Sequence, residues 1–208
     1  METKAAVPEP LVLRSDYDGI ADIMINRPKA YNALSIECMQ AITDEILAAG
    51  DDASVKVVIL SGSGKGFCAG HDLKEMRSNP AREFYERTFD LCSRMMTSIV
   101  NLPKPVIAKV HGVATAAGCQ LVATCDLAVA SEDARFATPG VNIGLFCSTP
   151  MVALSRNVPR KQAMEMLLTG ELVSAARACE IGLINSFVPF DRLDEAAIEL
   201  ASRILSKS

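Results

Sequence analysis

The chain has 208 residues, half of them hydrophobic, and a formal net charge of −4. This length suits one domain with a sizeable core, and this composition argues against disorder. Its charges are scattered, Trp is absent and no apolar run is long enough to cross a bilayer, so neither nucleic acid nor a membrane is an expected partner.

The first third of the chain has the pattern of a strand, a helix and a second strand. Residues 20–26 and 55–61 are short, β-branched and mostly apolar, which predicts buried strands. Between them, residues 35–49 carry apolar side chains at helical spacing, which predicts a helix. Ser35 is the expected N-cap, and Gly50 is the expected end of this helix.

The same alternation continues to the C-terminus. A helix is predicted for residues 82–100, because the sequence LPKP then interrupts the apolar periodicity, and a buried strand follows at 106–110. Residues 127–130 resemble another strand, and three more segments have helical periodicity: 159–168, 174–180 and 191–205, the last with a D-x-x-D start. This order predicts one α/β domain over residues 1–208 with mainly parallel strands.

The cysteines and the N-terminus indicate the compartment. Seven cysteines without a C-x-x-C pair, and only two histidines, predict reduced, mostly buried thiols and no metal site. Residues 1–10 are expected to be flexible, and they have the features of neither a signal peptide nor a transit peptide. We therefore predict a cytoplasmic location, with the mitochondrial matrix open for a processed form.

Two familiar catalytic patterns do not fit. GSGKG, residues 62–66, is too short for a phosphate-binding loop and has Gly66 where a hydroxyl is required. The sequence contains no G-x-S-x-G motif, and two histidines give little scope for a serine triad.

Two glycine- and alanine-rich turns are more informative. FCAGHDLKE (67–75) and HGVATAAGCQLV (111–122) each lead into a helix start, where backbone N–H groups remain unpaired. One N–H from each turn would form an oxyanion hole for a carbonyl that gains negative charge. Such turns are also common in α/β proteins without any catalytic role.

Residues 12–205 resemble the crotonase superfamily of enoyl-CoA hydratases and isomerases. The resemblance lies in four segments, in order and at the family's separations: NRPKAYNALS, GKGFCAGHDLKE, KPVIAKVHGVATAAGCQLVATCDLAVAS and ARFATPGVNIGL. It implies a crotonase-like spiral of ββα units, an acyl-CoA thioester as ligand, and coenzyme A only as part of that substrate. It also implies that the family's C-terminal trimerisation helices are missing, and that the chain forms a homo-trimer or a dimer of trimers if those helices are not required.

The resemblance also implies site residues. The oxyanion donors are the backbone N–H groups of His71 and Ala117. The residues implied in binding coenzyme A and its thioester are Lys29, Ala30, Ala69, His71, Asp72, Leu73, Lys74 and Ala117. For each lysine, a solvated surface charge is the alternative.

The sequence departs from the family at the two catalytic glutamates of its hydratases. Gln120 stands at the first position and Gly140 at the second. An amide cannot act as a base near neutral pH and glycine has no side chain, while general acid–base groups contribute about 10²- to 10⁴-fold each. Ordinary hydration is therefore expected to be severely reduced, and glutamate at both positions is expected to raise it.

Three other side chains are candidate substitutes for the missing glutamates. Asp126 belongs to a pair that is structural in the family. The imidazole of His71 is a candidate acid or base, because an unperturbed imidazole titrates near neutrality. The alternative is that this ring points away and hydrogen-bonds a neighbouring segment. Cys147 aligns with a tyrosine of the superfamily's methylmalonyl-CoA decarboxylases. The alternative is that Cys147 is only a small buried hydrophobic residue.

Three functions follow, and enzymatic activity itself stays open. The first is hydratase or isomerase chemistry, nominally the addition of water to a 2-enoyl-CoA. The second is decarboxylation of a malonyl-type CoA thioester, which needs an enolate-stabilising oxyanion hole more than a strong base. The third is non-catalytic acyl-CoA binding or regulation, which Gln120 and Gly140 favour together.

Overall fold

The computed structural model describes residues 9–207. Residues 1–8, most of the segment expected to be flexible, lie outside this range. Within it, no helix has both the length and the apolar character that crossing a membrane requires.

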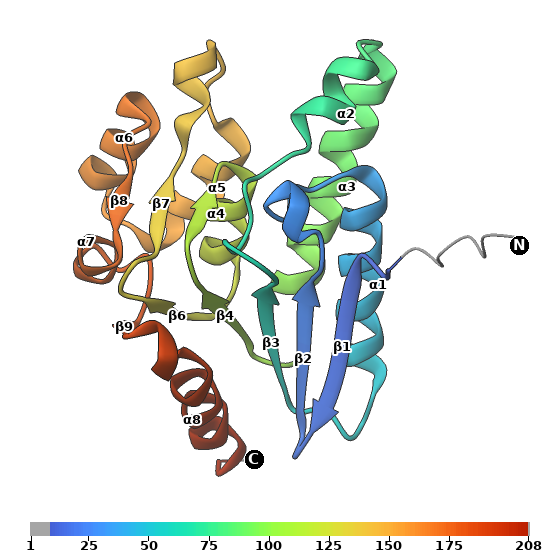
Figure 1. Cartoon of the computed structure of the whole chain (residues 1–208), viewed down its shortest axis with the longest axis vertical. Coiled ribbons are helices and arrows are strands. Elements are labelled where there is room, and N and C mark those ends of the chain that lie inside the picture. The colour runs from blue at the N-terminus through green and yellow to red at the C-terminus, as the bar shows by residue number, and fades with distance from the viewer. Residues whose placement is uncertain (1–8, 208) are drawn as a thin grey trace, which may run out of the picture.

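Two sheets organise the chain (Figure 1). In the larger sheet β1 pairs antiparallel with β2 and the other neighbours are parallel; its strands in spatial order are β1 (Val12–Tyr17), β2 (Ile20–Ile25), β3 (Val57–Gly62), β4 (Val106–Val110), β6 (Leu127–Ser131) and β9 (Ser186–Val188). The smaller sheet consists of β5 (Val113–Thr115), β7 (Arg135–Ala137) and β8 (Val173–Ser174). The prediction of a mainly parallel sheet is confirmed.

Helices follow the strands. The α-helices are α1 (Ile36–Asp51), α2 (Leu73–Ser78), α3 (Arg82–Val100), α4 (Ala117–Thr124), α5 (Ser148–Asn157), α6 (Arg160–Thr169), α7 (Ala175–Glu180) and α8 (Leu193–Leu205). Short 3-10 helices form η1 (Pro28–Ala30), η2 (Pro139–Ile143) and η3 (Phe190–Arg192).

The chain repeats a strand–strand–helix unit. β4 enters the large sheet, β5 enters the small one and α4 follows; β6 and β7 then repeat the two strands before η2 and α5. A parallel bridge between Cys68 and Ala114 ties the segment after β3 to β5 in the same manner. This is the predicted spiral of ββα units.

The large sheet is covered on both faces. Strands bury alternate side chains on opposite faces, so Val58 and Leu60 of β3 pack on the side of α1 and α3, while Val57 and Ile59 pack under α8. The apolar face of α8 contributes Ala197 and other residues to this second cluster. Figure 1 shows α8 set apart from the other helices, beside the strands. The amphipathic pattern of the last helix is thus explained by the sheet.

Most predicted elements are found, and two details differ. α3 and β4 have the predicted bounds, and Ser35 caps α1 by accepting from the Cys38 N–H at 3.2 Å. Gly50 does not end α1, which continues to Asp51; a Cβ on Gly50 would lie 2.9 Å from Leu102 Cδ1, the flexible end of that side chain. The last helix begins at Leu193, after η3, without a side-chain cap.

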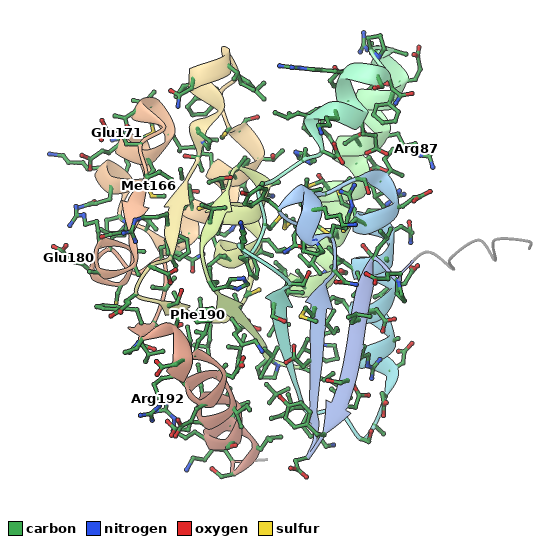
Figure 2. The ribbon with its side chains drawn as sticks, in the orientation of Figure 1. Arg87, Met166, Glu171, Glu180, Phe190 and Arg192 are labelled. Carbon is green, nitrogen blue, oxygen red and sulfur yellow. The ribbon has the colours of Figure 1, made fainter. Side chains whose placement is uncertain are left out.

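Most cysteine side chains lie in the interior, and the charged side chains labelled in Figure 2 lie at the edges of the molecule. All seven cysteines are free, and six of them are buried, which confirms the prediction that the thiols are mostly buried. Figure 2 shows Arg87 at the outer edge beside α3, and Glu171 and Glu180 at the opposite edge, beside α6 and α7.

Candidate active site

The first predicted turn leaves one backbone donor free. The N–H groups of Phe67, Cys68, Ala69 and Asp72 all donate to backbone carbonyls at 2.9–3.1 Å, and the Gly70 N–H points to the Cys68 sulfur at 3.4 Å. Within residues 9–207, the His71 N–H has no acceptor. The turn therefore offers a backbone donor at the predicted position.

The second turn ends at the start of α4. Ala116 donates its N–H to Ala137 O at 2.9 Å, and Gln120 N–H donates back to Ala116 O at 3.0 Å. Ala117 is the first residue of α4, so its N–H belongs to the unpaired first turn of the helix. Ala116 has φ of +51° and ψ of −119°, a backbone conformation that costs a residue with a Cβ about 1–3 kcal/mol. The strained residue, Ala116, directly precedes Ala117 and therefore sets the orientation of the Ala117 N–H.

Two glycines let the turns touch. A Cβ on Gly118 would lie 2.1 Å from Cys68 O, and a Cβ on Gly70 would lie 3.1 Å from the Ala117 nitrogen. Thr115 adds a hydrogen bond from Oγ1 to Ala69 O at 3.1 Å. Gly70 directly precedes His71, so the two predicted donors lie on turns locked against each other. This arrangement can hold a carbonyl oxygen between two N–H groups.

The His71 side chain is neutral and packed. Its ring meets the Phe89 ring edge-on, with 5.4 Å between centroids, and its Nε2 is buried without a partner among the described residues. Burial lowers the pKa of His71 from 6.5 to about 4. The expected hydrogen bond of this ring to a neighbouring segment is not found among residues 9–207, where the ring packs against Phe89 instead. The ring is thus no acid at neutral pH.

Gln120 brings an unpaired amide to the site. The residue is only 6% exposed, and its buried Oε1 accepts no hydrogen bond from any donor within residues 9–207. It lies one helical turn after Ala117 and lines a groove of about 540 Å³ between α3, α4 and α5. This groove was not predicted, because its lining comes from three helices that are distant in sequence.

The second glutamate position is filled by other atoms. A Cβ on Gly140 would lie 2.3 Å from Leu145 O and 2.7 Å from Cys147 Sγ. A glutamate at 140 would require this segment to move, since the first carbon of its side chain overlaps a carbonyl, and the gain in hydration expected from glutamate at both positions stays a prediction. Burial raises the pKa of the Cys147 thiol, and an N–H of Gly140 lowers it by less, so this thiol is held protonated.

Asp126 and Asp72 serve the backbone. Asp126 Oδ2 accepts from the Val106 N–H at 2.8 Å, in keeping with its structural reading. Asp72 caps α2 by accepting from the N–H groups of Lys74 and Glu75, and it pairs with Arg27 Nη2 at 2.9 Å. Burial raises the pKa of Asp72, but these hydrogen bonds lower it by more, so the pKa lies below its usual range. Asp72 therefore positions the turn with its carboxylate already engaged.

The remaining predicted contact residues lie in η1, in the turn before His71 and at the start of α2. Lys29 and Lys74 are exposed, Leu73 is half exposed, and Ala30 and Ala69 are partly buried. Buried Asn32 fixes the Lys29 loop: its Nδ2 donates to Ser63 O and Gly66 O at 2.8 Å, and its Oδ1 accepts from Arg27 N–H. Sequence reasoning missed Asn32, Arg27 and Phe89, whose partners are distant in sequence.

Comparisons with known proteins agree with this architecture. Residues 15–208 match the model of the enoyl-CoA hydratase/isomerase family. The crystal structure of an enoyl-CoA hydratase from Mycobacterium smegmatis is 56% identical, with a TM-score of 0.92, and covers 94% of this chain and 77% of that one.

The sequences of residues 70–75, 114–122 and 136–150 resemble one protein within the family, and the comparisons confirm this resemblance. Enoyl-CoA hydratase domain-containing protein 3, mitochondrial, is 49% identical in Homo sapiens over 97% of this chain and 50% identical in Rattus norvegicus over 92%. The chain spans 66% and 64% of those relatives, respectively. The chain therefore belongs to the enoyl-CoA hydratase/isomerase family.

Proposed function

We propose that the chain binds acyl-CoA thioesters, with the thioester oxygen held by the backbone N–H groups of His71 and Ala117. The observation that carries this proposal is the contact between the two turns through Gly70 and Gly118, which brings two free donors together. Donors fixed in advance stabilise negative charge on an oxygen without reorganising. Relatives named for hydratases of CoA thioesters support the ligand class.

Hydration by paired carboxylates is not part of the proposal. Gln120 stands at the first glutamate position with an amide in place of a base, and the space beside Gly140 is filled by Leu145 O and the Cys147 thiol. The function proposed first here is therefore thioester binding without the proton transfer of the family's hydratases. Decarboxylation of a malonyl-type thioester is the second candidate, because loss of CO₂ leaves an enolate that needs donors and only later a proton.

A carbonyl-deletion ligand tests the first function. Binding of hexanoyl-CoA is compared by calorimetry with hexyl-CoA, a thioether in which CH₂ replaces the carbonyl. Two hydrogen bonds to the oxygen predict that the thioester binds roughly tenfold tighter or more. Equal affinity for the two ligands overturns the assignment of His71 and Ala117 as donors.

A paired variant gives the control. Gly118→Ala forces the turns apart, because its Cβ would meet Cys68 O at 2.1 Å, and is expected to remove most of the preference for the thioester. Gly50→Ala, in α1 and away from the turns, is expected to retain it. Release of CO₂ from malonyl-CoA or methylmalonyl-CoA above the level of the Gly118→Ala protein would favour the second candidate.

Three further properties complete the proposal. Lys29 and Lys74 are the proposed partners of CoA phosphates, because both are exposed, Lys29 in η1 and Lys74 in the first turn of α2, which directly follows the His71 turn. The relatives named mitochondrial support a matrix location alongside the predicted cytoplasmic one. A homo-trimer or dimer of trimers stays a prediction, which light scattering checks.

A further inference from the structure

The His71 turn is joined to the η1 loop (residues 27–34) by one isolated bridge between Leu34 and His71. The Leu34 N–H donates to Gly70 O at 2.8 Å, and Leu34 O accepts from the Asp72 N–H at 3.0 Å. In a parallel pair, the residue between those two partners directs its own N–H and C=O to the other side. The His71 N–H therefore points away from Leu34, and its orientation depends on this bridge.

The bridge belongs to neither sheet, so other contacts must support it. Its two hydrogen bonds replace hydrogen bonds to water and give only a small net stabilisation. The Ala69 N–H donates to Tyr31 O at 3.0 Å on one side, and the Ile36 N–H donates to Glu75 Oε2 at 3.0 Å on the other. Both of these bonds lie two or more residues from His71, so they do not fix the residues beside it.

The Arg27 side chain contacts both strands of the bridge, at the residues next to it. Its Nη1 donates to Ala33 O, directly before Leu34, and its Nη2 donates to Asp72 Oδ2 at 2.9 Å, directly after His71. The Arg27 side chain is 20% exposed and that of Asp72 is 15% exposed, so the pair is largely shielded from water. A planar guanidinium holds its N–H groups in a fixed geometry, so this one group sets the separation of the two segments.

The Arg27 backbone is itself fixed. Its N–H donates to Asn32 Oδ1 at 2.8 Å, and its carbonyl accepts from the N–H groups of Ala30 and Asn32 at 2.9 and 3.0 Å. Asn32 is fully buried, and its Nδ2 donates to Ser63 O and Gly66 O, in the segment after β3. The guanidinium is therefore carried by a backbone that is attached to the end of the large sheet.

We propose that Arg27 is a positioning residue for the oxyanion hole, because it joins Ala33 to Asp72 and so keeps the His71 N–H directed at the thioester oxygen. The inference rests on the proposed thioester binding. Arg27 acts through Asp72 and the bridge, without contact to the carbonyl. A donor that is fixed before the ligand arrives needs no reorganisation, so losing Arg27 weakens recognition of the carbonyl more than binding of the rest of the ligand.

The preference for a thioester and the carbonyl stretch of the bound ligand test this role. Calorimetry compares hexanoyl-CoA with hexyl-CoA, and infrared spectra of hexanoyl-CoA with ¹³C at the carbonyl report hydrogen bonding to its oxygen. Arg27→Gln is expected to reduce the thioester preference roughly fivefold and to reverse part of the lowering of the stretch. Asp72→Asn, which removes the same ion pair and retains a cap for α2, is expected to act in the same way.

Arg14→Gln is the matched control. The Arg14 side chain is 17% exposed and pairs with Asp16 and Asp52, on β1 and after α1. Removing it also breaks shielded ion pairs, but it is expected to leave the thioester preference and the carbonyl stretch unchanged. The comparison separates a general loss of stability from the positioning of one donor.

Each outcome decides something different. If the wild-type chain binds hexanoyl-CoA and hexyl-CoA equally, or binds neither, the proposed function fails and this inference fails with it. If the wild-type chain prefers the thioester, and Arg27→Gln and Asp72→Asn keep both the preference and the stretch, the positioning role is wrong while thioester binding stands. Equal changes in Arg14→Gln would overturn it as well. Should Arg27→Gln fail to fold, Asp72→Asn decides the question alone.

Discussion

The Cys147 sulfur lies where a side chain on Gly140 would begin, 2.7 Å from a Cβ built there. The Leu145 carbonyl closes the same space at 2.3 Å. A glutamate at 140 therefore needs the 139–147 segment to move, and replacing the cysteine alone leaves the carbonyl in place. The loss of the second glutamate is thus built into the backbone of this segment.

Gly140→Ala is expected to lower the free energy of unfolding by about 1–3 kcal/mol, because a methyl group is forced onto a backbone carbonyl. Urea denaturation measures the loss. Gly50→Ala is the control: its Cβ would meet only the flexible end of Leu102, and alanine favours the helix, so little change is expected. A Gly140→Ala protein as stable as the control would show that the segment is free to rearrange.

Ala116→Gly is expected to leave stability unchanged or raise it by up to about 1 kcal/mol, because glycine adopts the positive φ of this position without strain. Ala41→Gly, inside α1, is expected to lose about 1 kcal/mol from helix propensity. Thermal or urea unfolding of both variants gives the comparison. Equal destabilisation of the two would mean that Ala116 stores no backbone strain.

Asp72→Asn separates the ion pair from the helix cap, since asparagine caps α2 about as well. Loss of the part-buried pair with Arg27 is expected to cost about 1–3 kcal/mol of unfolding free energy. The exposed pair of Arg82 and Glu86 is the control, and Glu86→Gln is expected to cost under about 0.5 kcal/mol. Costs of similar size at the two sites would remove the positioning role assigned to Asp72.

The His71 ring predicts a pH effect with a definite sign. Its folded pKa of about 4 lies below the usual 6.5, so the folded chain binds this proton less readily than the unfolded chain. Its stabilisation is full above about pH 6.5 and is lost as the pH falls toward 4, by about 1–3 kcal/mol in total. His71→Phe keeps the backbone donor and is expected to flatten this part of the stability profile.

NMR titration checks the same claim directly, with a His111→Gln variant to assign the two ring signals. A His71 midpoint below pH 5 agrees with a buried ring against Phe89. A midpoint near 6.5 would place the ring in solvent.

Local patterns in the sequence predicted much of the fold. α3 and β4 were predicted at their observed bounds because the periodicity of each is bordered by Pro or Asn. β5 and β7, of three residues each, were missed because so short a strand has no periodicity and is placed by pairing with distant residues. The prediction that Gly50 ends α1 was wrong by one residue, since the helix continues to Asp51 and Gly50 packs close to Leu102, a residue of another segment.

The site divides in the same way. The turns before His71 and Ala117 were found from their composition and the family resemblance, since small residues at a helix start leave N–H groups free. The filled space at Gly140 and the unpaired amide of Gln120 depend on neighbours from other segments. No spacing within the sequence encodes those contacts, so only the structure could supply them.

The most direct test of the account follows the absorbance of the conjugated thioester of crotonyl-CoA at high protein concentration, with calorimetry of hexanoyl-CoA on the same sample. The account predicts that hexanoyl-CoA binds and that crotonyl-CoA is hydrated no faster than by the Gly118→Ala protein. Hydration at a rate typical of enzymes, about 1 s⁻¹ or more, would contradict it and would require a proton-transfer group other than Gln120 and Gly140.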